Sequence, residues 1–187
     1  LRGWSIRGEN TGTQIRLDFP ADNNGFACTN DNKFSFGEFA DFYVYGVNGR
    51  EKGFYFYGGP GGGAPANMRF RNMRFQNLSE AITMDGPGGS NSWLTDRHIL
   101  DHVIFVPSSE AGATGYWVKN NSQSVVHTFV NVEFMALEPN TIGLRFQSGG
   151  SLNWHGGSVI VHNNAVGIQI DDDPHTLPNE IGDFNGT

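Results

Sequence analysis

The chain has 187 residues and carries 12 Lys+Arg against 19 Asp+Glu, which gives a formal net charge of -7. This length is enough for one domain with a sizeable core, and the acidic balance argues against a nucleic-acid partner, because phosphate binding needs a basic surface. No run of about 18 apolar residues is present, so we expect no membrane-spanning segment. The lone Cys28 cannot form an internal disulfide. Residues 1–187 begin directly in patterned sequence, and we interpret them as a single domain of a longer chain.

A six-residue phrase recurs along the whole chain and reads as one apolar residue, two others, then apolar–polar–apolar. Its copies start at Leu1, Phe39, Phe70, Leu100, Phe129 and Trp154, at intervals of 25–38 residues. After each copy comes a second phrase with apolar residues two positions apart: Ile15/Leu17, Phe54/Phe56, Ile82/Met84, Tyr116/Val118, Leu144/Phe146 and Ile168/Ile170. Period-two alternation in short segments rich in aromatic and β-branched residues is typical of strands. A repeat of this length built from strands alone indicates a solenoid of about six coils.

The third residue of each first phrase predicts a sharp bend. These residues are Gly3, Asp41, Asn72, His102, Asn131 and Gly156, and Gly and Asn reach positive φ most cheaply, with Asp and His next. Each phrase is therefore expected to be a strand, a bend and a second strand. Two inward stacks follow from this register: Trp4, Phe42, Met73, Val103 and Val132 with Gly157 in the slot below, and Ile6, Val44, Phe75, Phe105, Phe134 and Val159.

The Asn-type bend, the "GIQI" strand at 167–170 and the opening "WSIRGENTGTQIRL" carry a family resemblance. With them the chain resembles the right-handed parallel β-helix of the pectate lyase, polygalacturonase and phage tailspike superfamily. The resemblance implies an all-β fold, a right-handed single-stranded parallel β-helix of about six coils, and activity on an extracellular polysaccharide. The "NTD", "DD…GHG" and "RIK" series of the polygalacturonases does not occur in its proper order.

The outward positions of the second strand form a candidate groove for a glycan. One residue per copy gives Arg16, Tyr55, Thr83, Trp117, Arg145 and Gln169, and the position after each strand gives Asp18, Tyr57, Asp85, Lys119, Gln147 and Asp171. Aromatic faces stack on sugar rings, and Arg and Asp bind hydroxyl and carboxylate groups. We therefore expect substrate contacts from Arg16, Tyr55, Tyr57, Trp117, Arg145, Gln147 and Gln169. The alternative is a mixed polar surface with ordinary exposed aromatics.

Catalysis would need paired carboxylates or a base beside a sugar C–H group. In this register Asp18 and Asp85 lie two coils apart, about 10 Å, close to the roughly 6.5–9.5 Å that separates the carboxyl groups of inverting glycosidases. The alternative is that Asp85 pairs with Lys119 and that Asp18 is solvated. For an elimination reaction, Lys119 and Arg145 are the basic candidates.

Two metal sites can be considered. The run Asp171, Asp172 and Asp173 offers the oxygen ligands that Ca²⁺ prefers, and pectate lyases use this ion; three successive acids in a loop are otherwise simply solvated. Ca²⁺ is the one cofactor that the sequence suggests. His98 and His127 align on adjacent coils and could share a metal, but no third ligand is evident.

The first functional hypothesis is a carbohydrate-active β-helix, a hydrolase or lyase like a tailspike depolymerase or a secreted pectate-lyase-like enzyme. The second is a non-catalytic structural or adhesive stalk, viral or bacterial, that binds glycan without cleaving it. Both hypotheses place the protein outside the cell or on the virion surface. Because strand edges remain at the ends of the coil, we also expect a homotrimer or ends capped by other parts of the parent chain.

Overall fold

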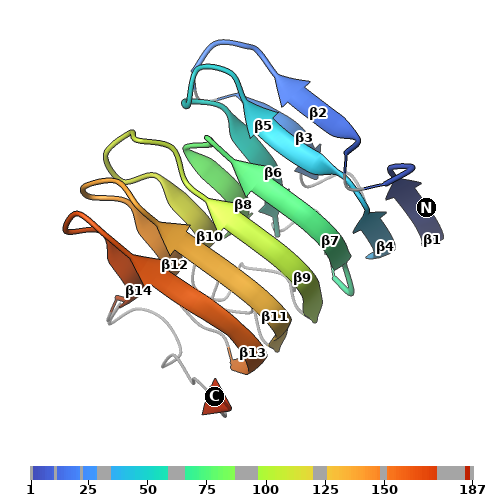
Figure 1. The fold of residues 1–187 in the computed structure, drawn as a ribbon. Coiled ribbons are helices and arrows are strands. Elements are labelled where there is room, and N and C mark those ends of the chain that lie inside the picture. Colours follow the sequence, from blue (N-terminus) through green and yellow to red (C-terminus); the bar gives the residue numbers. More distant parts are fainter. Residues whose placement is uncertain are drawn as a thin grey trace.

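The computed structural model describes residues 2–10, 12–21, 23–28, 35–58, 66–86, 97–119, 126–147, 151–171 and 184–185. Within these residues the chain forms strands and no helix, and every strand pairing is parallel. Figure 1 shows strands stacked side by side in two facing layers. The predicted all-β parallel solenoid is therefore confirmed.

Two sheets form the walls of the solenoid. Sheet A has nine strands: β1 (Arg2–Arg7), β2 (Gln14–Leu17), β4 (Ser35–Ala40), β5 (Tyr43–Gly46), β7 (Arg69–Gln76), β9 (His98–Val106), β11 (His127–Ala136), β13 (Leu152–Val161) and β15 (Phe184–Asn185). Sheet B has six strands: β3 (Asn24–Cys28), β6 (Lys52–Tyr57), β8 (Glu80–Asp85), β10 (Thr114–Val118), β12 (Ile142–Phe146) and β14 (Val166–Ile170).

The solenoid has about four turns rather than the six expected from the repeat. Four coils, β4/β5–β6, β7–β8, β9–β10 and β11–β12, have a neighbour on both sides in both sheets. The first and last copies lie at the ends, where β3 pairs with β6 and β14 pairs with β12 on one side only. The terminal copies therefore contribute strands to the sheets, but they are not counted among the four turns that have neighbours on both sides.

The predicted bends are confirmed at five successive positions of sheet A. The φ angles are 64° at Asp41, 50° at Asn72, 55° at His102, 50° at Asn131 and 71° at Gly156. Side chains connect neighbouring bends, because the Asn72 Nδ2 group donates to Asp41 Oδ1 at 2.9 Å and Asn131 Nδ2 lies 3.2 Å from His102 Nε2. The residue types at the bend thus serve both the backbone angle and the contact between coils.

Asn72→Val is expected to destabilise the protein by about 1–2 kcal/mol, because a β-branched residue resists positive φ. Thermal melting of the purified variant measures this effect. Asn72→Gly is the matched control, since it loses the hydrogen bond to Asp41 but accepts the backbone angle. Equal melting temperatures for Asn72→Val and the parent protein would contradict the assigned bend.

The core is a set of aromatic stacks that run from coil to coil. Phe75, Phe105 and Phe134 are 0% exposed, and their ring centroids lie 5.2 and 4.9 Å apart. The stack ends at Val159, which is 37% exposed because no complete coil of described residues covers it. Opposite Val132, Gly157 fills the predicted slot, where a Cβ atom would lie 2.0 Å from the Val132 carbonyl oxygen.

The predicted register is wrong in the first coil. Ile6, rather than Leu1, pairs with Phe39, so Trp4 and Ile6 are not the first members of the two stacks. The strand bearing Ile15 and Leu17 pairs with β5 in sheet A, and the sheet-B strand of this coil is β3. The reason is that several residues intervene between β1 and β2 at the bend, so the halves of the first phrase are separated in the sequence.

Candidate functional site

The outer face of sheet B carries most of the predicted groove residues in one line. Neighbouring strands place Ala27, Tyr55, Thr83, Trp117, Arg145 and Gln169 in register, and we call these six residues the outer row. Successive strands lie about 4.8 Å apart, so the line from Tyr55 to Gln169 is about 19 Å long. Four of the residues predicted to contact substrate, Tyr55, Trp117, Arg145 and Gln169, thus lie in one line.

Strand alternation points these side chains outward. On β10, Tyr116 and Val118 are 0% exposed and face the core, while Trp117 between them is only partly buried. Thr83 is 1% exposed and donates its hydroxyl hydrogen to Glu80 Oε2 at 2.7 Å. Thr83, between Tyr55 and Trp117, is therefore covered by its neighbours.

Two cations lie over the indole ring of Trp117. Lys119 Nζ is 4.1 Å and Arg145 Cζ is 4.7 Å from the ring centroid. The indole Nε1 is buried and has no hydrogen-bond partner among the described residues. Cation–π contacts of this kind are worth about 0.5–2 kcal/mol, so the orientation of Trp117 is set by its neighbours rather than by solvent.

Carboxylates hold the polar members of the outer row in place. Arg145 Nε donates to Asp171 Oδ2 at 2.7 Å, and Gln169 Nε2 donates to Asp171 Oδ1 at 2.6 Å. Both carboxylate oxygens of Asp171 thus accept hydrogen bonds from the protein. Asp172 and Asp173 lie outside the described residues, and within the described part of the chain no three His, Cys, Asp or Glu side chains gather to hold a metal. The Ca²⁺ site stays a prediction from the sequence.

Tyr55, Tyr57 and Asp85 form the other end of the candidate groove. The two tyrosine rings stack with centroids 6.3 Å apart, and the Tyr55 hydroxyl donates to Asp85 Oδ2 at 3.0 Å. Asp85 Oδ1 accepts a hydrogen bond from the backbone N–H of Gly86 at 2.8 Å. Burial, followed by the Asp85 carboxylate, raises the pKa of Tyr55, so the phenol stays protonated and keeps donating to Asp85.

Arg16 does not join the outer row, and Asp18 does not join the line of Tyr57 and Asp85 beside it, so both predicted placements are wrong. They belong to the end of β2 in sheet A, where Arg16 pairs with Tyr45 and its Cζ atom lies 5.9 Å from the Tyr45 ring centroid. The exposed Asp18 accepts a hydrogen bond from Asn48 Nδ2 at 3.3 Å. Asp18 and Asp85 therefore do not occupy equivalent positions two coils apart, because β2 is a sheet-A strand and β8 a sheet-B strand.

The remaining predicted residues have the following places. Lys119 Nζ lies 3.6 Å from Glu80 Oε1, which also pairs with Lys52 Nζ at 3.0 Å. Gln147 follows β12 and is partly buried, and its backbone N–H donates to the Val118 carbonyl. These positions continue the line from Asp85 to Asp171 beside the outer row.

His98 and His127 are part of the core. Both are 0% exposed, and their rings stack with centroids 5.9 Å apart. The Tyr116 hydroxyl lies 2.8 Å from His127 Nδ1. The pair thus packs among aromatic side chains, and the described residues add no third metal ligand to it.

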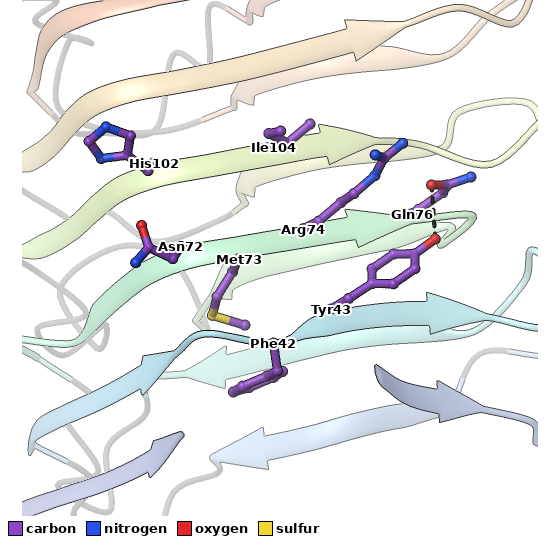
Figure 2. Close-up of a pocket in the computed structure, with 8 residues that line it drawn as sticks. All are labelled: Phe42, Tyr43, Asn72, Met73, Arg74, Gln76, His102 and Ile104. Carbon is purple, nitrogen blue, oxygen red and sulfur yellow. Dashed lines mark hydrogen bonds between the residues drawn. The ribbon is translucent and has the colours of Figure 1, made fainter. Parts of the chain in front are cut away.

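A cleft on the outer face of sheet A was missed by the sequence reasoning. Its volume is about 530 Å³, and Figure 2 shows the residues that line it: Phe42, Tyr43, Asn72, Met73, Arg74, Gln76, His102 and Ile104. The signal lay in the outward positions of the first phrase, which were not compared between copies. Burial raises the pKa of Tyr43, the nearby Arg74 guanidinium partly offsets this, and Tyr45 adds to it.

The part of the chain that the structure describes contains no helix with the length and apolar character needed to cross a bilayer. Compared with protein-family models, with curated proteins and with solved structures, the chain matches none of them. The structure therefore supports the parallel β-solenoid fold, and the resemblance to the pectate lyase superfamily stays a prediction from the sequence motifs.

Proposed function

We propose that this solenoid binds a polysaccharide chain along the outer row of sheet B. The observation that carries the proposal is the line of Tyr55, Trp117 and Arg145 in register on strands of one sheet. Aromatic faces next to fixed hydrogen-bonding groups suit sugar rings, which present both C–H edges and hydroxyl groups. A linear polymer fits a line better than a single pocket would.

The contacts within the outer row support binding by a preorganised surface. Asp85 fixes the hydroxyl of Tyr55, Asp171 fixes Arg145, and two cations fix Trp117. Side chains that are already ordered lose less rotamer entropy when a ligand arrives, which is worth about 0.5–1.5 kcal/mol for each side chain. The same contacts already occupy the hydroxyl of Tyr55, one N–H group of Arg145 and part of the ring face of Trp117. We therefore expect moderate rather than tight binding.

The proposal is binding rather than cleavage. The carboxylate pair expected to act on a glycosidic bond is not assembled, since Asp18 lies beside Asn48 in another part of the fold. The basic candidates for elimination are engaged by Trp117 and by carboxylates, Lys119 with Glu80 and Arg145 with Asp171. This favours the stalk-like hypothesis, a glycan-binding module without its own catalytic centre.

Trp117→Ala is expected to weaken binding roughly tenfold, about 1.4 kcal/mol, and to change the melting temperature little, because an outward residue supports little of the core. The measurement is calorimetric titration with neutral and uronate-containing hexasaccharides that bind the parent protein in an initial screen. Tyr45→Ala is the matched control, because Tyr45 is also an outward aromatic but lies on sheet A.

Three outcomes would contradict the proposal: no hexasaccharide binds, Trp117→Ala and Tyr45→Ala have equal effects, or affinity is unchanged in Trp117→Ala. Analysis of the saccharides after incubation tests the absence of cleavage. New reducing ends would indicate hydrolysis, and unsaturated ends absorbing in the ultraviolet would indicate elimination. We expect neither product.

A further inference from the structure

The cleft on sheet A contains an arginine that forms no ion pair with a carboxylate of the described residues. Arg74 is exposed on β7, and no ion pair between described residues includes it. On the same strand, Arg69 pairs with Asp101 at 2.9 Å, and Arg71 pairs with Asp41 at 3.2 Å. Carboxylates thus neutralise the two other arginines of β7 but not the one that lines the cleft.

The strands beside Arg74 explain why it has no carboxylate partner among the described residues. In register, Arg74 lies between Tyr43 on β5 and Ile104 on β9, and neither carries a charge. The first carboxylate along this line is Glu133 on β11, which pairs with Ile104. Glu133 is therefore two strands from Arg74, about 10 Å along the sheet. In a chain with a net charge of -7, such a cation is a local exception and attracts anions.

A second donor lies at the same end of the cleft. The Tyr43 hydroxyl donates to Gln76 Oε1 at 2.8 Å, so the amide oxygen is occupied and the Nε2 group points away from Tyr43. Gln76 lies two residues after Arg74 on the same face of β7, and Figure 2 shows the guanidinium and the carboxamide at one end of the cleft. An anion placed there could accept hydrogen bonds from both side chains.

The rest of the cleft suits a ring. Arg74 Cζ is 5.9 Å from the Tyr43 ring centroid, and Ile104 adds an aliphatic wall. Asn72 and His102 provide polar groups at the bend, at the opposite end (Figure 2). The volume of about 530 Å³ falls within the roughly 300–1,000 Å³ of small-molecule sites.

We infer that this cleft is a second binding site, separate from the outer row, for an anionic group carried on a sugar-sized ring. The anion is held by Arg74 and Gln76, and the ring contacts Tyr43 and Ile104. A carboxylate and a sulfate ester share this chemistry. The two sites face away from each other, because one is on the outside of sheet A and the other on the outside of sheet B.

Calorimetric titration with four probes tests the inference: glucuronate, glucose 6-sulfate, glucose and inorganic sulfate. We expect at least one of the two anionic sugars to bind at least tenfold more tightly than glucose, and their ratio distinguishes carboxylate from sulfate. Glucose binding as tightly as both anionic sugars, or no binding by either, would overturn the charge requirement. Inorganic sulfate binding as tightly as glucose 6-sulfate would overturn the requirement for a ring.

Two variants assign the binding to the cleft. Arg74→Gln should reduce affinity for the anionic sugar at least tenfold. Arg16→Gln is the matched control, because Arg16 lies at the same 5.9 Å from a tyrosine ring on the same sheet but does not line the cleft. Retained affinity in Arg74→Gln, or an equal loss in both variants, would overturn the assignment.

Ile104→Glu tests the same site without removing the arginine. It places a carboxylate in register with Arg74 and should supply the ion pair that the cleft lacks. We expect a similar loss of affinity for the anionic sugar and an unchanged melting temperature. Full affinity in this variant would contradict an anion held at Arg74, whatever the result with Arg74→Gln.

Discussion

Phe105→Ala is expected to destabilise the protein by about 3–5 kcal/mol, the usual cost of removing a fully buried phenylalanine. Phe105 is 0% exposed and lies in the middle of the stack, between Phe75 at 5.2 Å and Phe134 at 4.9 Å. Its ring also meets Tyr116 of sheet B edge-on at 6.3 Å. The substitution therefore removes contacts along the axis and across the core at once.

The cavity left by Phe105→Ala cannot collapse easily. Both neighbours in the stack belong to strands whose spacing of about 4.8 Å is fixed by the backbone ladder, so the coils cannot move together to fill it. Differential scanning calorimetry should show a fall in melting temperature on the order of 10 °C.

Ile104→Ala is the control, because Ile104 is the neighbouring residue on the opposite, outward face of β9, and its loss should cost less than about 1 kcal/mol. Equal effects of the two substitutions would mean that the inward and outward faces of β9 have been exchanged, which is the signature of a strand slipped by one residue.

The sequence predicted the middle coils well because each fixes its register with several independent features. The bend residue needs positive φ, the inward residues must be apolar, and the strands alternate with period two. Asn72, His102 and Asn131 meet the first condition, and each is followed directly by a buried residue. A shift of one residue would break all these features together, so they agree on a single alignment.

The first coil was predicted in the wrong register because several residues separate β1 from β2 at the bend. The repeat was defined as six consecutive residues, so it does not fit a copy with an insertion. A row of small residues, one on each strand of sheet B, identifies the correct first copy. The residue before the second phrase is small in the last five copies: Gly53, Ala81, Gly115, Gly143 and Gly167. Ile15/Leu17 breaks this rule because it follows Gln14, whereas Phe26 follows Gly25. At Gly115 and Gly143 a Cβ atom would lie 2.5 and 2.6 Å from a carbonyl oxygen of the next coil. Extending this row of small residues toward the N-terminus selects "GFAC", residues 25–28, as the first copy and excludes the strand that bears Arg16.

The candidate sites depended on information that strand periodicity does not contain. Alternation placed Trp117 outward, but the position of Lys119 and Arg145 over its ring depends on rotamers of long side chains. The cleft on sheet A is lined by side chains of β5, β7 and β9 and of the bends beside them. A sequence shows which residues share a face, but not whether their side chains enclose a cleft.

Gly157→Ala is expected to destabilise the protein by about 2–5 kcal/mol. Gly157 has a φ of 107°, and an added Cβ atom would lie 2.0 Å from the carbonyl oxygen and 2.7 Å from the nitrogen of Val132 on the neighbouring coil. The backbone angle alone costs an L-residue about 1–2 kcal/mol, and relieving the collision must shift one backbone against another, which adds about 1–3 kcal/mol.

Gly112→Ala separates these two contributions. Gly112 also has a positive φ, 82°, but nothing lies within 4 Å of the Cβ position, so only the backbone angle should matter and the loss should be about 1–2 kcal/mol. Chemical denaturation of both variants gives the two free energies of unfolding. A larger loss for Gly157→Ala locates the close approach of β13 to β11, since only the contact differs between the variants. Equal losses would show that these strands are not packed backbone to backbone at Val132, and the last coil would then need a different register.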